Sequence, residues 1–167
     1  MILRTLTLAG GLAGAAATSQ FPEFSQQYMQ RLGGAVDALS GVVADFDASA
    51  QAVGLDREAA LAQLTGTAFL DRRRVDMTQT IARHTRLQSD LAVLQGQGPF
   101  MRAYHLPRRT DPQIVQAAWD VYQPAVPLNM AGGIFAALGF VVGGGVIGFV
   151  LHMLRLPFRR RSAGNPA

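Results

Sequence analysis

Residues Leu128–Leu154 read LNMAGGIFAALGFVVGGGVIGFVLHML, 27 residues without a formal charge, and they dictate how the chain is organised. Only Asn129 and His152, near the two ends, are strongly polar. A helix of this length spans roughly 40 Å, which is enough to cross a ~30 Å hydrocarbon core with some tilt. As the core of a soluble protein it would have to be surrounded on every side, and the rest of the chain has too few apolar residues for that. The segment therefore predicts a transmembrane helix.

A second, weaker apolar segment lies within residues 1–20, and two interpretations of it compete. A secretory signal peptide would use Arg4 as its basic start and Ala15-Ala16-Ala17 as the small residues before a cleavage site. A short uncleaved span would let the Arg4 side chain reach the membrane interface and would use its small residues for helix contact. Glycines interrupt the leucines, which is weak for a signal peptide, and aromatic residues follow where an interfacial belt is expected. We favour the uncleaved span.

The acidic residues are confined to the middle of the chain. All 11 lie between Glu23 and Asp120, where 10 arginines almost balance them. The net charge of +4 therefore belongs to the tails, whose arginines are Arg4, Arg155, Arg159, Arg160 and Arg161. A basic nucleic-acid-binding face on the middle domain is disfavoured, so no nucleic-acid partner is expected. The chain has no cysteine, which excludes disulfides and thiolate sites.

The same charge distribution predicts the topology. Arginine excess marks the cytoplasmic side of short flanks, and the arginines precede the first span and follow the second, so both termini should be cytoplasmic. Loops longer than ~60 residues cross the membrane largely regardless of charge. We therefore expect a bacterial inner-membrane protein with a first transmembrane helix over 1–20, a periplasmic helical domain over 21–127, a second transmembrane helix over 128–154 and a basic cytoplasmic tail over 155–167, in which Arg155, Arg159, Arg160 and Arg161 anchor the topology and contact lipid.

A long helix is predicted to begin at Pro22, with Glu23 in its first turn, and to end at Gly54. Its apolar positions step alternately by four and three residues, a coiled-coil-like seam made of Leu32, Val36, Leu39, Val43, Phe46, Ala50 and Val53. A helix with three internal glycines needs a packing partner.

That partner is predicted further along the chain. Asp56 can cap a second helix that ends near Gly66, and a third helix over about 69–95 repeats the apolar pattern. Asp111-Pro112 begins a final short helix, terminated by Pro124 and Pro127. The expected fold is an all-α membrane protein in which two transmembrane helices flank a helical hairpin or small bundle.

Glycines in both apolar segments are spaced by four residues. Gly143–Gly148 formally matches G-x-G-x-x-G, but no acidic residue follows it and it lies inside the charge-free segment, so a dinucleotide site is not expected. Such spacing instead lets two helices approach closely. The helix-packing candidates are Gly10, Gly14, Gly139, Gly143, Gly144 and Gly148, facing either the other span or another subunit.

No pattern of catalytic chemistry stands out. The three histidines have no second His or Glu at helical ligand spacing, so no metal site is expected, and His84 is interpreted as a seam or surface residue. There is no nucleophile-elbow motif and no phosphate-binding loop. We expect no catalytic residues, no cofactor and no enzymatic activity.

Residues 19–34, SQFPEFSQQYMQRLGG, resemble the opening of a proteobacterial family of membrane proteins known only as a domain of unknown function. The later Trp119, residues 124–127 (PAVP) and the glycine-rich second span are similar to its C-terminal half. The resemblance implies a two-span inner-membrane protein and brings no activity, cofactor or catalytic residue. We interpret the motif as an elbow of the chain at the depth of the lipid headgroups, with aromatic counterparts just before the second span. The residues of this interfacial motif are Phe21, Pro22, Glu23, Phe24, Gln27, Tyr28, Gln30 and Arg31, and the counterparts are Trp119 and Tyr122.

These patterns favour a non-catalytic accessory or assembly subunit of a larger membrane complex, with lipids and other integral membrane proteins as partners. Self-association into a homo-oligomeric scaffold or pore is an alternative, motivated by the glycine-lined span and the seam. A periplasmic sensor or binding module is a third.

Overall fold

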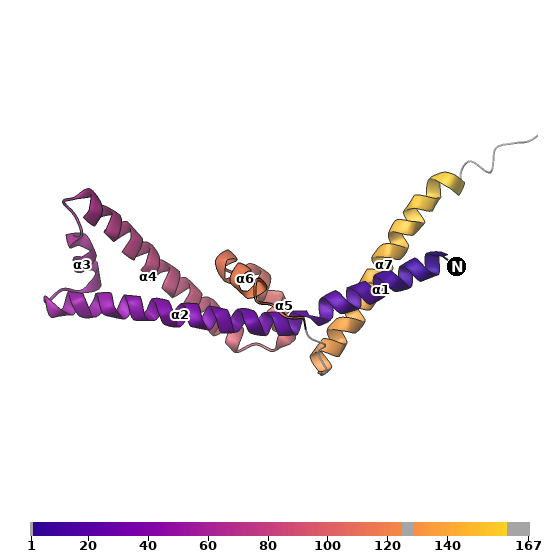
Figure 1. Ribbon diagram of the computed structural model, residues 1–167, viewed down its shortest axis with the longest axis horizontal. Helices are drawn as coiled ribbons and strands as arrows, with labels where there is room; N and C mark the ends of the chain where they lie inside the picture. Colours follow the sequence, from indigo (N-terminus) through magenta and orange to yellow (C-terminus); the bar gives the residue numbers. More distant parts are fainter. Residues whose placement is uncertain (1, 125–128, 160–167) are drawn as a thin grey trace, which may run out of the picture. The chain divides into compact units, whose positions relative to one another are not determined.

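The protein is all-α in the residues that its computed structural model describes, 2–124 and 129–159, the last five of them by backbone alone (Figure 1). The chain divides into two compact units. The first joins the two ends, Met1–Phe24 and Gln123–Ala167, and the second is the middle of the chain, Ser25–Tyr122. We call them the terminal helix pair and the middle domain.

The terminal helix pair consists of α1 (Ile2–Ser19) and α7 (Met130–Arg159). Asn129 caps α7, because its Oδ1 accepts a hydrogen bond of 2.7 Å from the Gly132 N–H. Contacts near the end of α1 reach the start of α7 and contacts near its beginning reach the end of α7, so the two helices are antiparallel. They cross each other in Figure 1.

One helix in the described part of the chain, Met130–Leu154 within α7, is long and apolar enough to cross a membrane. The segment predicted as the first span is helical, but α1 falls below the hydropathy that would mark it as a span. The reason lies in its composition, because Arg4, threonines and glycines dilute its leucines.

The middle domain contains the rest of the helices. They are α2 (Phe21–Ala52, whose first residues belong to the terminal pair), α3 (Arg57–Gln63), α4 (Ala68–Gln95), α5 (Pro99–His105), the 3₁₀ helix η1 (Leu106–Arg108) and α6 (Pro112–Trp119). α2 and α4 run in opposite directions as the two arms of a hairpin, and α3 connects them at the tip (Figure 1). The predicted hairpin is therefore present.

The core of the middle domain follows the predicted seam. Its buried apolar residues are Tyr28, Leu32, Val36, Val43 and Ala50 of α2, Leu87 and Leu94 of α4, and Leu106, Ile114 and Ala118. The seam does not extend to Val53, whose side chain is 70% exposed, because α2 ends at Ala52. α6 likewise ends at Trp119, before Pro124, and Pro127 lies outside the described residues.

Local capping explains where these helices start and stop. Gly54 has φ +74°, and the Leu55 N–H donates to the Ala50 carbonyl, the arrangement that ends a helix with a left-handed glycine. The Asp56 carboxylate then accepts from the Ala59 N–H at 2.7 Å and caps α3. An ion pair between Arg57 and Asp47 fastens α3 to α2, and the hydrogen bond from Arg57 lowers the pKa of the Asp47 carboxyl.

Candidate functional site

Glycines form the contact between α1 and α7. A Cβ added at Gly14 would collide with the backbone carbonyl of Gly139, and one added at Gly139 would collide with that of Gly14. A Cβ on Gly143 would likewise meet the Gly10 carbonyl oxygen. Both helices thus offer a residue without a side chain every four positions, which lets their backbones come together.

The other predicted glycines lie on the same surface. A Cβ on Gly144 would lie 3.5 Å from the Thr7 carbonyl oxygen, and one on Gly148 would lie 3.9 Å from the Thr7 side chain. All six packing candidates of the sequence therefore face the other helix of the pair. By contrast, Gly133 and Gly145 have nothing within 4 Å of an added Cβ.

A hydrogen bond and an aromatic contact reinforce one end of this surface. The Thr18 hydroxyl lies 2.6 Å from the Phe135 carbonyl oxygen on α7 and 2.9 Å from the Gly14 carbonyl oxygen of its own helix. The Phe21 ring packs against the Phe135 ring with 5.3 Å between centroids. Sequence reasoning missed Thr7 and Thr18, although they continue the small-residue spacing of α1 on either side of Gly10 and Gly14.

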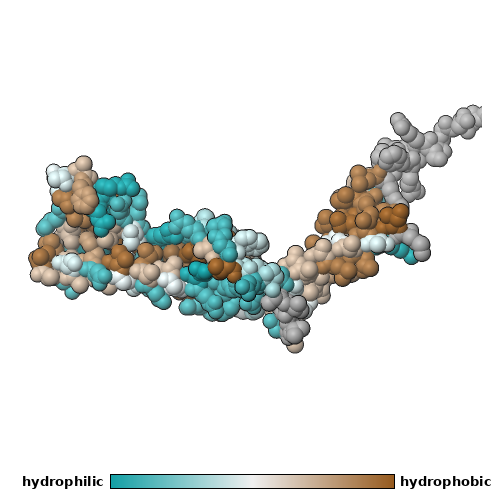
Figure 2. Space-filling view, viewed as in Figure 1, coloured by the Kyte–Doolittle hydropathy of each residue, from teal (hydrophilic) through white to brown (hydrophobic). Residues whose placement is uncertain are grey.

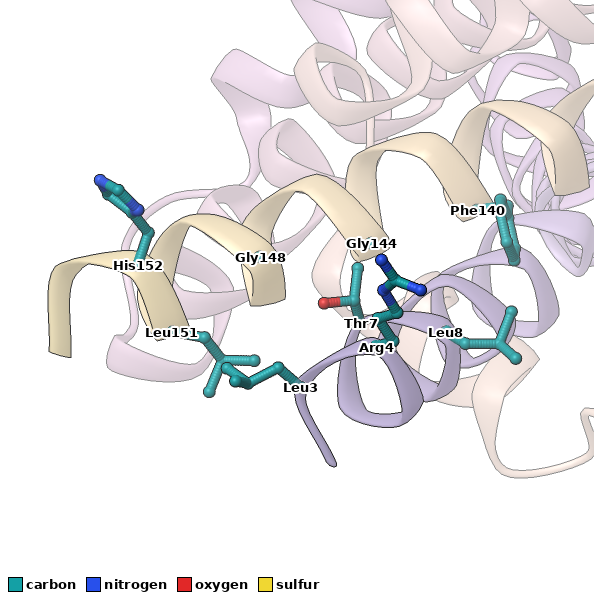
Figure 3. Close-up of a pocket in the computed structure, with 9 residues that line it drawn as sticks. All are labelled: Leu3, Arg4, Thr7, Leu8, Phe140, Gly144, Gly148, Leu151 and His152. Atoms are coloured by element: carbon teal, nitrogen blue, oxygen red, sulfur yellow. The ribbon is translucent and has the colours of Figure 1, made fainter. Parts of the chain in front are cut away.

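A groove opens between the helices on the side of the chain ends (Figure 3). It has a volume of about 450 Å³ and is lined by Leu3, Arg4, Thr7, Leu8, Phe140, Gly144, Gly148, Leu151 and His152. Apolar side chains dominate the lining, and Arg4 and His152 are the ionisable members. The groove is thus mainly apolar and has two ionisable side chains in its lining.

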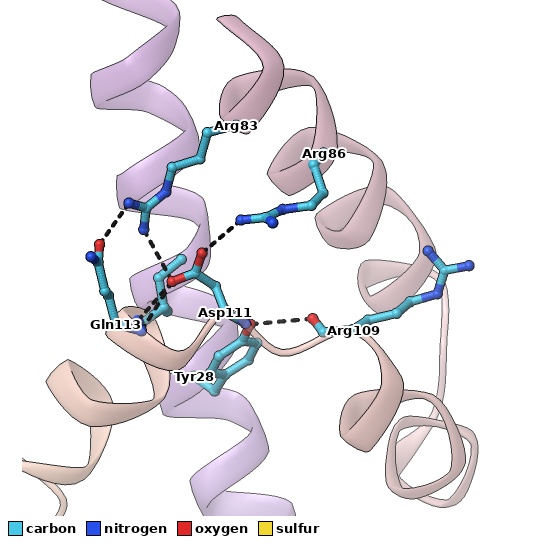
Figure 4. Close-up of polar contacts among 7 residues, drawn as sticks. Tyr28, Arg83, Arg86, Arg109, Asp111 and Gln113 are labelled. Carbon is cyan, nitrogen blue, oxygen red and sulfur yellow. Dashed lines mark hydrogen bonds and ion pairs between the residues drawn. The ribbon is translucent and has the colours of Figure 1, made fainter. Parts of the chain in front are cut away.

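A second set of contacts lies inside the middle domain and centres on Asp111 (Figure 4). The Asp111 carboxylate, only 5% exposed, caps α6 by accepting from the N–H groups of Gln113 and Ile114 at 3.1 and 3.3 Å. It also accepts hydrogen bonds of 3.0 Å from Arg83 and from Arg86 of α4. One carboxylate therefore fixes α6 to α4.

Tyr28 completes this network from α2. Its hydroxyl accepts from the Asp111 N–H at 3.0 Å and donates to the Arg109 carbonyl at 3.3 Å. Burial raises the pKa of the Tyr28 hydroxyl, the largest of several influences. Arg109 in turn forms an ion pair of 3.0 Å with Asp90. These contacts join α2, α4 and α6, as expected of a structural network that holds the domain together, although the buried Nε of Arg83 has no partner among the described residues.

The position of Tyr28 differs from the sequence interpretation. Its ring is 0% exposed, so it belongs to the core of the middle domain and not to a surface at headgroup depth. The other motif residues of α2 are partly or fully exposed, namely Phe21, Pro22, Glu23, Phe24, Gln27, Gln30 and Arg31. Trp119 is 63% exposed and stacks on Tyr122, with 5.8 Å between ring centroids.

The remaining predicted positions are the C-terminal arginines and His84. The backbone of Arg155 and Arg159 continues α7, and Arg160 and Arg161 lie outside the described residues. His84 is half-buried on α4, and no cluster of three or more metal-ligating side chains occurs among the residues described.

Comparison with known proteins identifies a family for this chain. Neither the curated proteins nor the solved structures contain a sequence or fold that matches this chain. A family described as "Protein of unknown function (DUF2937)" matches residues 2–160, which include both helices of the terminal pair and the whole middle domain. Since the match extends over nearly all of its 167 residues, the chain belongs to this family of unknown function, DUF2937.

Proposed function

We propose that this protein is a non-catalytic component of the bacterial inner membrane, an accessory or assembly subunit of a larger membrane complex. The terminal helix pair is its anchor, with two transmembrane helices, and the middle domain is the part that works outside the bilayer. The observation that carries the proposal is the apolar outer surface of the pair.

Large apolar side chains cover that surface (Figure 2). On α1, Ile2 is 77% and Leu12 59% exposed, and on α7, Val141 is 70% and Phe149 64% exposed. Soluble monomers rarely expose contiguous apolar patches larger than a few hundred Å². Lipid is the surrounding that stabilises such a surface. The 18 residues of α1 form a helix about 27 Å long, which crosses most of a ~30 Å hydrocarbon core and places Arg4 at the membrane interface.

The antiparallel packing supports the predicted topology. It brings the N-terminus of α1 and the C-terminus of α7 to the same end of the pair. In the sequence, Arg4 is close to the first of these termini and the other tail arginines follow residue 154. Arginine excess favours the cytoplasm for short flanks. The middle domain, 98 residues from Ser25 to Tyr122, then lies in the periplasm.

Two exposed glycines of α7 support the binding of a further helix to this anchor. Gly133 and Gly145 leave open space where a Cβ would stand, and they are not used in the contact between α1 and α7. α7 is also longer than α1, 30 residues against 18, so α1 cannot cover its whole length. Another helix approaching at Gly145 could come as close as α1 does at Gly139.

A second copy of this chain is the alternative partner, since it too would bring an apolar helix to Gly145. The glycines that motivated self-association in the sequence are largely occupied within the pair, which favours a different protein. Copies with two different tags, expressed together, separate these cases. An accessory subunit should co-purify in mild detergent with a stoichiometric foreign protein, and a homo-oligomer should co-purify with its differently tagged copy.

The anchor itself is tested first. The full chain should stay in the membrane pellet after alkaline carbonate washing, and a reporter fused after Arg161 should be active only in the cytoplasm. Gly145→Leu should then lower partner recovery at least tenfold, whereas the matched variant Ala16→Leu, at an exposed position of α1, should leave it unchanged. Release by carbonate, or a monomer without any partner, would contradict the proposal.

A further inference from the structure

The groove between α1 and α7 combines features that the anchor alone does not require. Its floor is Gly144 and Gly148, whose missing side chains give it depth, and its walls include Leu8 and Phe140 (Figure 3). Its volume of about 450 Å³ is within the range of ~300–1,000 Å³ that is usual for small-molecule sites. An extended hydrocarbon chain is a ligand that such a surface would accept.

The charge in the groove lacks a counterpart within the terminal helix pair. Apart from Glu23, no acidic residue occurs in residues 1–24 or 123–167, and Glu23 is 19 positions from Arg4. Arg4 is in the first turn of α1 and Glu23 follows the end of that helix, so the ~27 Å length of α1 separates them, far too great a distance for an ion pair. The Thr7 side chain lies beside Arg4, whereas the His152 ring points away from it (Figure 3). An anion beside Arg4 would thus meet the guanidinium donors and no acidic side chain of the groove lining.

We propose that this groove binds one anionic phospholipid. One acyl chain lies along Leu8, Phe140 and the glycine floor, and the phosphate accepts hydrogen bonds from Arg4, with the Thr7 side chain close by (Figure 3). Guanidinium groups suit phosphate because they can donate two parallel hydrogen bonds. A zwitterionic lipid is the poorer ligand, because its ammonium group would meet the Arg4 guanidinium and no acidic side chain of the groove lining.

This inference depends on the proposed function, since it requires the helix pair to lie in a bilayer. Carbonate extraction tests that part separately: release from the membrane would refute the anchor, whereas a retained protein that binds no anionic lipid would refute only the groove.

The test is native mass spectrometry of the full chain, released from nanodiscs that contain equal amounts of phosphatidylglycerol and phosphatidylcholine. The wild type should retain one phosphatidylglycerol, at least tenfold more often than phosphatidylcholine. Arg4→Gln should lower phosphatidylglycerol retention at least tenfold. Gly148→Leu, which fills the groove and leaves Arg4 in place, should abolish it.

A control variant distinguishes binding in the groove from a general attraction of anionic lipid to the positive charges of the protein. The triple variant R159Q/R160Q/R161Q removes three positive charges from the C-terminal tail, none of which lines the groove, and should retain the lipid as the wild type does. Circular dichroism and size exclusion show whether each variant keeps its fold. Equal retention of the two lipids, unchanged binding in Arg4→Gln, or loss of binding only in the triple variant would overturn the proposal.

Discussion

Replacing Asp111 by alanine should open the end of the middle domain, and the structure sets the size of the effect. The variant loses the cap of α6, worth about 1 kcal/mol. It also leaves Arg83, one-third exposed, without its carboxylate. Removing one partner from a buried ion pair costs ~3–5 kcal/mol, and exposed pairs contribute ~0–1 kcal/mol, so a half-buried pair lies between them. Together these losses amount to about 3 kcal/mol, or roughly a 100-fold increase in local opening.

The absence of native cysteine makes this opening measurable. Ala118→Cys places a thiol on α6 at a position that is 0% exposed, and its rate of labelling reports how often α6 detaches. In the full chain in mild detergent, Asp111→Ala should label about 100-fold faster than the parent. Asp111→Asn, which keeps an oxygen to cap α6, should fall in between.

Arg86→Ala is the matched control for this experiment. It breaks the other ion pair of Asp111, but its side chain is 61% exposed, so we expect at most about 1 kcal/mol, or a fivefold change. If Asp111→Ala labelled within fivefold of the parent, or if Arg86→Ala matched it, the carboxylate would not be the element that holds α6 to α4.

Two further outcomes follow from the contacts. Because burial raises the pKa of Tyr28, its contribution to the free energy of unfolding should be complete below pH ~10 and should decline as the pH rises through the folded-state pKa. Tyr28→Phe should lower the free energy of unfolding by ~1–2 kcal/mol at neutral pH, and thermal melts of this variant should show no such decline. An oxidised Thr7→Cys/Gly148→Cys pair should form a disulfide within one chain; adding Gly139→Leu, which collides with α1, should reduce its yield severalfold on non-reducing gels, whereas adding Gly145→Leu should not.

Helix limits could be predicted because their signals are local. Gly54 and Asp56 act through backbone groups within five residues, and both function as their sequence context indicated. Asp111 likewise begins α6 as predicted. Its ion pairs with Arg83 and Arg86 could not be foreseen, because they join residues 25–28 positions apart, and no periodicity encodes them.

Tyr28 shows the same limit from the opposite side. Next to Phe21 and Phe24 its sequence context is that of an interfacial aromatic, yet its hydroxyl meets groups 81–83 residues away. For the glycines, spacing predicted close approach and left the partner open. The matched four-residue repeat in α1 and α7 answers that question, because Gly10 and Gly14 face Gly143 and Gly139 in order.

The separation of α1 from α7 along the chain affects how such an anchor would be made. A ribosome that has just finished Ser19 must synthesise about 110 more residues before Met130 appears, and at ~5–20 residues per second this takes roughly 5–20 s. During that delay the glycine face of α1 has no counterpart from its own polypeptide. A nascent chain in this state would depend on an insertase or another membrane protein to keep its first helix in place until synthesis is complete.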